Sequence, residues 1–70
     1  MLKYNNLSSS IALYESGHDY ILIEFKNKNQ YLYNYKISGK KEVEEMKRLA
    51  KLGKGLCSYI QKNKIGYIKK

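Results

Sequence analysis

Two alternating runs, joined by a short polar connection, constrain the fold of this chain more than any other feature. The run YILIEFK at 20–26 and the run YLYNYKI at 31–37 each place every second residue on one side of an extended chain. The connection NKNQ at 27–30 contains asparagines, which tolerate left-handed backbone and suit a hairpin turn. The pattern predicts an antiparallel hairpin. The weaker run SSIALYE at 9–15 predicts a third strand, joined through the turn residues SGHD.

Helical spacing replaces alternation in the second half of the chain. Four apolar residues of KKEVEEMKRLAKL recur at this spacing: Val43, Met46, Leu49 and Ala50. Ser38 is the expected N-cap and Gly53 the expected end of this helix. The segment LCSYIQKN predicts a second, short helix.

The expected fold class is therefore α+β, with a three-stranded antiparallel β-meander packed against one longer and one short C-terminal helix. We expect a single domain over 1–70. Its parts are a lead-in at 1–8, the meander at 9–37, a helical part at 38–63, and a tail at 64–70 that can add a short extended segment.

The helix needs a sheet face to cover, and one face of the meander is apolar enough to serve. Its expected members are Ile21, Ile23, Phe25, Tyr31, Tyr33 and Ile37. On this interpretation at least two tyrosines lie half-buried under the helix, with hydroxyls at the edge. The alternative is an exposed platform on which a ligand's rings stack.

The opposite face of the sheet has no obvious cover. It is expected to hold Tyr20, Leu22 and Leu32, with Tyr14 or Ala12 beside them. An exposed apolar patch favours association. We therefore expect a homodimer or higher oligomer, formed by pairing these faces or by adding sheet edges.

A domain of 70 residues usually needs stabilisation beyond its hydrophobic core, and this chain offers few sources of it. Cys57 is the one cysteine and His18 the one histidine, so an internal disulfide and a structural zinc site are both excluded. Oligomerisation is the remaining support. The lone cysteine fits a reducing compartment, and neither a signal peptide nor an apolar membrane span is visible, so we expect a cytoplasmic protein with no membrane partner.

Positive charge is confined to the second half. The net charge is +8, and residues 1–35 carry three lysines and three acidic residues, so the whole excess lies in 36–70. A localised basic surface favours a polyanionic partner such as a nucleotide or RNA, although solubility alone also explains it. A single arginine argues against base reading in duplex DNA.

Lysines, tyrosines and small hydroxyls supply the candidate ligand-binding residues. They are Ser9, Ser10, Tyr31, Tyr33, Lys47, Arg48, Lys51, Lys54, Gly55, Tyr59 and Tyr67. Rings stack on bases and ammonium groups bind phosphates. Backbone N–H groups at Lys54-Gly55 can approach a phosphate in a nest. Cations near a helix C-terminus also have a purely structural cause, the helix dipole.

Catalysis is not expected. The segment GKG lacks the spacing of a phosphate-binding loop, and Cys57 and His18 lie in parts of the chain that the predicted fold keeps apart. Glu44 and Glu45 are adjacent on a lysine-rich helix, which is typical of a solvated face. We expect no cofactor and no bound metal.

Several short motifs together resemble the KTSC domain family, over roughly residues 8–67. They are Ser8-Ser9-Ser10-Ile11, EFKN at 24–27, Tyr31-x-Tyr33, Ile37, Lys54-Gly55 and Tyr67. The family occurs at the C-terminus of some lysyl-tRNA synthetases and as stand-alone bacterial or phage proteins. Where the family often has a proline after the third strand and Phe-Asn after Lys-Gly, this chain reads SGK and CSY.

The resemblance implies a compact β-meander with helices, no catalytic activity, and RNA binding. Its stand-alone phage members suggest another use, a small oligomeric protein that sequesters a host signalling nucleotide. We therefore expect a non-catalytic binding module for a phosphate-bearing ligand. The alternatives are an RNA-binding accessory domain and a protein–protein inhibitor that acts through the basic half.

Overall fold

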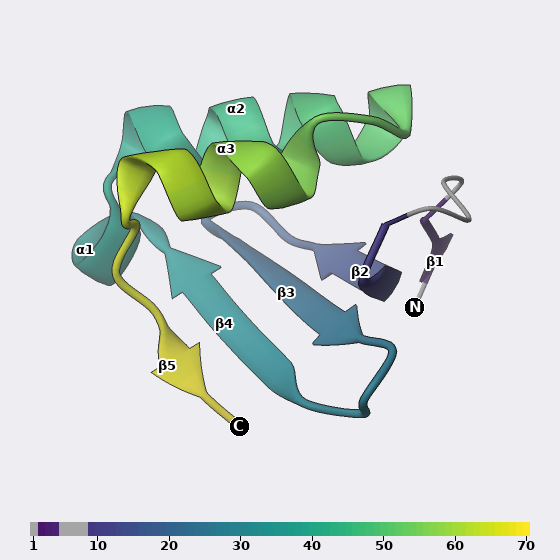
Figure 1. The fold of residues 1–70 in the computed structure, drawn as a ribbon. Coiled ribbons are helices and arrows are strands. Elements are labelled where there is room, and N and C mark those ends of the chain that lie inside the picture. Colours follow the sequence, from purple (N-terminus) through teal and green to yellow (C-terminus); the bar gives the residue numbers. More distant parts are fainter. Residues whose placement is uncertain (1, 5–8) are drawn as a thin grey trace.

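The strands follow the alternating runs, and two short strands are added at the edges. The computed structural model describes residues 2–4 and 9–70, with strands β1 (Leu2–Lys3), β2 (Ile11–Ser16), β3 (Tyr20–Phe25), β4 (Gln30–Asn34) and β5 (Ile68–Lys69) (Figure 1). Within this described part they form one antiparallel sheet in the order β1-β2-β3-β4-β5. The α+β class is confirmed, but the prediction of three strands is wrong.

The two added strands have two residues each. Part of the predicted lead-in pairs with β2 as β1, Tyr4 follows it into the core, and residues 1 and 5–8 lie outside the described residues. The predicted extended segment in the tail is present as β5, which pairs with β4.

The helices α1 (Tyr35–Ser38), α2 (Lys40–Leu52) and α3 (Leu56–Asn63) follow β4 in the chain. Helices α2 and α3 lie side by side over one face of the sheet (Figure 1). Gly53 ends α2 as expected, since it adopts a left-handed conformation with φ 84° and donates its N–H to the Leu49 carbonyl. Ser38 does not cap α2: Gly39 holds that position, and the Ser38 hydroxyl donates to the Gly66 carbonyl at 2.5 Å.

The third predicted strand ends three residues early, at Asn34. The Asn34 side-chain oxygen accepts from the Ile37 N–H at 2.8 Å, which is an N-cap bond, and the chain turns into α1. Tyr35 therefore leaves the sheet. Ile37 is 43% exposed, so its predicted place in the core is wrong.

The core lies between the sheet and the two longer helices. Its fully buried side chains are Ile11, Ile21, Ile23, Tyr33, Val43, Met46 and Leu56. Tyr33 has no exposed surface, while Tyr31 and Phe25 are half-buried at its margin. Of the tyrosines in the run at 31–37, Tyr33 therefore belongs to the core and Tyr31 lies at the margin of the core.

A bulge in β2 decides which of its side chains face the helices. Ile11 pairs with Phe25 and Leu13 with Glu24, so Ala12 is an extra residue and the alternation shifts by one. Tyr14 consequently pairs with Ile23 and is buried beneath the helices. Its expected place on the opposite face is wrong, because a one-residue shift moves a strand's side chains to the other side.

The face of the sheet that points away from the helices is here called the outer face, and none of the helices formed by the described residues lies over it (Figure 1). Tyr20, Leu22 and Leu32 lie on it, as expected, and each is half-exposed. None of the helices in the described part of the chain has the length and hydropathy that a membrane span requires.

Candidate functional site

The predicted binding residues do not form one site, because they lie in four separate places. Arg48 and Tyr59 line a depression of about 630 Å³ between α2 and α3, which Lys41 and Asn63 also line. Both guanidinium contacts of Arg48 are with Glu45, whose pKa is lowered by that hydrogen bond. The positive charge of Arg48 is therefore largely compensated there.

Lys47 is held on another side of the molecule, against the β2–β3 turn. Its ammonium group donates to the His18 carbonyl at 2.9 Å and to Glu44 at 3.0 Å. The Tyr35 hydroxyl also donates to Glu44, and these two bonds lower the pKa of the Glu44 carboxyl. This network fastens α2 to the sheet, and it is a structural role for Lys47.

Lys51, Lys54 and Gly55 lie at the link from α2 to α3, and all three are exposed. Gly55 is left-handed with φ 82°. The Leu56 N–H, next to the predicted phosphate nest of Lys54 and Gly55, donates to the hydroxyl of the buried Tyr4 at 3.4 Å. Lys54 keeps its exposed ammonium group beside the start of α3.

The fourth place brings together the largest group of predicted residues. Tyr31 and Tyr67 stack with ring centroids 4.5 Å apart and planes 24° apart, and the centroid of the Phe25 ring lies 5.2 Å from that of Tyr31. The Tyr33 ring lies 5.7 Å from Tyr67. Tyr67 is 48% exposed, so the stack has one ring in the core margin and one ring open to solvent.

Polar groups lie close to this stack. The hydroxyl of Ser10 and the thiol of Cys57 are 3.4 Å apart, and the Gln61 amide donates to the same thiol at 3.5 Å. Burial raises the pKa of Tyr33, and the neighbouring Tyr67, Tyr31 and Cys57 raise it further. Tyr33 thus lies near both Cys57 and the stacked rings of Tyr31 and Tyr67.

A lysine flanks the stack on the sheet. Lys69 is the cross-strand partner of Tyr31, and directly opposed residues of an antiparallel pair project to the same face. Tyr67 precedes it by two residues and shares that face. The name tyrosine site is used below for Ser10, Tyr31, Cys57, Tyr67 and Lys69, with Tyr33 as its floor.

Ser9 has a local role at the edge of this site. Its hydroxyl accepts from the Ile11 N–H at 3.1 Å and so fixes the entry into β2. Tyr33 was predicted both as core and as a ligand-binding ring, and its complete burial excludes direct contact with a ligand.

Sequence reasoning missed Cys57 and Lys69 as members of the site, and Gln61 as the neighbour of Cys57. Cys57 was considered only as a disulfide partner, a zinc ligand or a nucleophile, and the structure shows it half-buried beside Ser10. The signal for Lys69 was available in the tail, where Tyr67 and Lys69 have the period of a strand. Cys57 and Gln61 are four residues apart on α3, a spacing that brings side chains together on one helix face.

Comparisons with protein-family models, curated proteins and solved structures found no match to this chain. The resemblance to the KTSC family therefore stays a prediction, and the tyrosine site has to be interpreted from its own chemistry.

Proposed function

We propose that this protein is a small, non-catalytic binding module whose ligand carries a flat base and a phosphate group and has the size of a nucleotide. One observation carries the proposal, the stack of Tyr31 and Tyr67 with the Tyr67 ring 48% exposed. A base can stack on a tyrosine whatever its identity, because every base has a π-face.

Polar groups around the rings match the other parts of such a ligand. The Ser10 hydroxyl, the Cys57 thiol and the Gln61 amide supply donors and acceptors for the edge of a base or for a sugar hydroxyl. Lys69 supplies a positive charge on the same face as the Tyr31 ring. Lys54, three residues before Cys57, supplies a second one from the link before α3, outside the tyrosine site as defined above.

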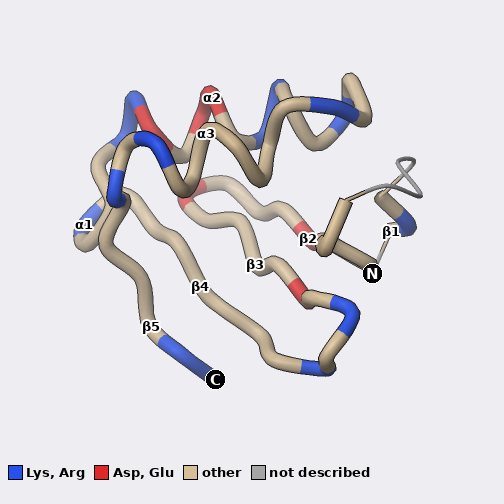
Figure 2. The backbone as a smooth tube through the Cα atoms, viewed as in Figure 1, with Lys and Arg blue, Asp and Glu red and all other residues tan. Residues whose placement is uncertain are grey.

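The layout of charge favours a small ligand over a long RNA. Lysines and Arg48 are spread over both longer helices, the β3–β4 turn and the two edge strands, with acidic residues between them on α2 (Figure 2). A long RNA is bound along a continuous basic groove. The resemblance to the KTSC family, with its stand-alone phage members, points to a host signalling nucleotide as the ligand.

The surroundings of Cys57 support a binding role without catalysis. Its side-chain contacts, Ser10 and Gln61, are not bases, and the His18 ring packs near Tyr35 at the β2–β3 turn. A nucleophilic cysteine needs an adjacent base or a cation that stabilises its thiolate. Within residues 2–4 and 9–70, no group of three or more acidic, histidine or cysteine side chains is placed to hold a metal.

The test is isothermal titration calorimetry of the wild-type protein and of Tyr67→Ala with the four nucleoside 5′-monophosphates and their 3′,5′-cyclic forms. Loss of one base–ring stack is worth about 1–3 kcal/mol, so the variant should bind roughly 5- to 150-fold more weakly. Tyr20→Ala is the matched control, because its ring lies on the outer face, and its affinity should equal that of the wild type. Lys54→Glu should also weaken binding, by about tenfold.

A ten-nucleotide single-stranded RNA is titrated in parallel. Binding of the RNA with no binding of any mononucleotide would replace the proposal by the RNA-binding alternative. Binding to neither, or equal affinities for Tyr67→Ala and Tyr20→Ala, would refute the tyrosine site.

A further inference from the structure

The pair of Tyr31 and Tyr67 differs from the other tyrosine contacts in the described part of the chain. Its rings stack with centroids 4.5 Å apart and planes 24° apart, so carbon atoms of one ring face carbon atoms of the other. Tyr4 and Tyr14 instead meet edge to face at 6.5 Å, and both of them are buried. Among the described tyrosines, only the pair of Tyr31 and Tyr67 combines stacked rings with access to solvent.

Solvent reaches this pair through Tyr67, which is 48% exposed, while Tyr31 is half-buried. Tyr33 is the other tyrosine beside Tyr67, with ring centroids 5.7 Å apart and planes tilted by 48°. It has no exposed surface, and burial raises its pKa, so loss of its phenolic proton is unfavourable. An oxidant in solution therefore reaches Tyr67 first, and Tyr31 is the neighbouring phenol that can still release its proton to water.

We propose that Tyr31 and Tyr67 are a site of oxidative cross-linking, at which a carbon–carbon bond between the two rings joins β4 to the residue before β5. The reactant is a one-electron oxidant, of the kind that a peroxidase forms from hydrogen peroxide. The proposal is independent of which ligand the tyrosine site binds.

The reaction balances with hydrogen peroxide as the other reactant. Each ring gives one electron to the oxidant and its phenolic proton to water, which leaves two tyrosyl radicals. The radicals couple through ring carbons adjacent to the hydroxyl-bearing carbons, and the hydrogens on the coupled carbons move to the phenolic oxygens. Both rings are then aromatic phenols again. One hydrogen peroxide takes up the two electrons and the two protons and becomes two molecules of water, so the protein loses two hydrogen atoms.

The place of Tyr67 in the fold lets the two rings approach each other. Tyr31 is held within β4, between Ile23 of β3 and Lys69 of β5. Tyr67 directly precedes β5, an edge strand of two residues, and short edge strands move more readily than the centre of a sheet. The bond would close a loop between residues 31 and 67, and a cross-link of this kind restricts the unfolded chain. Oxidation would therefore fasten β5 to the sheet.

Treatment of the dilute 70-residue chain with a peroxidase and an equimolar amount of hydrogen peroxide tests the proposal. Intact mass spectrometry of the monomer should show the loss of two hydrogen atoms, together with the blue fluorescence of dityrosine. After digestion with trypsin, the new bond should join the peptide 29–36, which contains Tyr31, to the peptide 65–69, in which Tyr67 is the one tyrosine.

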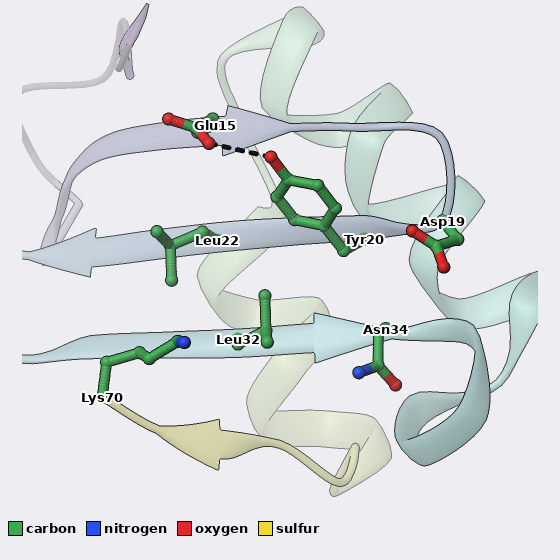
Figure 3. A pocket seen from close by; sticks show the side chains of 7 residues that line it. All are labelled: Glu15, Asp19, Tyr20, Leu22, Leu32, Asn34 and Lys70. Atoms are coloured by element: carbon green, nitrogen blue, oxygen red, sulfur yellow. Dashed lines mark hydrogen bonds between the residues drawn. The ribbon is translucent and has the colours of Figure 1, made fainter.

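Tyr67→Phe and Tyr31→Phe keep the ring and remove the hydroxyl, so each variant should fold and should lose the internal cross-link. Tyr20→Phe is the matched control. Tyr20 is half-exposed on the outer face, its hydroxyl donates to Glu15 at 2.8 Å, and no described aromatic ring packs against it (Figure 3). This variant should form the cross-link with the yield of the wild type.

Three outcomes would overturn the assignment. The first is a wild type that forms no internal cross-link, or that forms bonds only between two chains. The second is a Tyr67→Phe variant with the yield of the wild type. The third is a bond that fragmentation of the joined peptides places at Tyr33 in place of Tyr31.

Discussion

The burial of Tyr33 gives a sharp prediction for the substitution Tyr33→Ala. Its side chain has no exposed surface and packs among Ile21, its cross-strand partner, and the helices. Removing a buried aromatic side chain costs about 3–5 kcal/mol. A domain of this size has a stability of roughly 4–10 kcal/mol at most, and its core often supplies only about 3–5 kcal/mol. The variant should therefore be largely unfolded at 25 °C.

Urea unfolding followed by far-ultraviolet circular dichroism measures the effect. With a slope of about 1 kcal/mol per molar urea for a small protein, the midpoint should fall by about 3–5 M. Tyr67→Ala is the comparison, because its half-exposed ring loses only an aromatic pair worth about 0.5–1.5 kcal/mol. A loss of less than about 1.5 kcal/mol for Tyr33→Ala would refute the assignment of Tyr33 to the core.

Three further predictions concern the helix ends and the network at Glu44. Asn34→Ala removes the N-cap of α1 and should cost about 1 kcal/mol, or about 4–8 °C in Tm by calorimetry; an unchanged Tm would contradict the capping role. Gly53→Ala forces a left-handed alanine at the end of α2 and should cost about 1–2 kcal/mol, whereas Gly53→Asn should cost less. The pKa of Glu44 is lowered on folding, so its stabilising effect is present above the ordinary glutamate pKa of about 4.3 and is lost as the pH falls through the folded value. The Tm of Glu44→Gln should lie below that of the wild type at neutral pH and converge with it near pH 3; a constant difference would show that the carboxylate charge is not involved.

Strong periodicity made the central part of the fold predictable from the sequence. The alternation around Ile21 and Ile23 and the helical spacing of Val43 and Met46 specify a hairpin and the helix that covers it. The errors lie where one local bond overrides the period. Asn34 lies in the middle of the strand predicted at 31–37, and the bond from the Ile37 N–H to its side chain ends that strand.

The face of β2 could not be predicted for a different reason. A bulge at Ala12 leaves no mark in the sequence, yet it turns Tyr14 from the outer face into the core. The strand β1 has two residues, which is one full period of alternation and carries no pattern.

The tyrosine site was predictable only in part. Tyr31, Tyr67 and Ser10 were candidates on chemical grounds, but charge alone assigned them the same site as Arg48 and Lys47. In the structure, Glu45 and Glu44 hold those two cations elsewhere. A basic residue of α2 that forms an ion pair with an acidic residue of the same helix is less available to bind a ligand, and the sequence alone does not show which pairs form.

The pairing of β5 with β4 has a consequence for the dynamics of the protein. The pairings among β2, β3 and β4 join neighbours in sequence, whereas β4 and β5 are separated by all the helices of the described chain. Contacts between distant segments pay a larger loop-closure cost and tend to form late. β5 is an edge strand of only two residues, so few hydrogen bonds hold it to β4. It should therefore open by local unfolding while the central strands stay protected from hydrogen exchange. Tyr67 opens with it, and the stacked ring pair therefore forms and separates with one of the two shortest strands of the sheet.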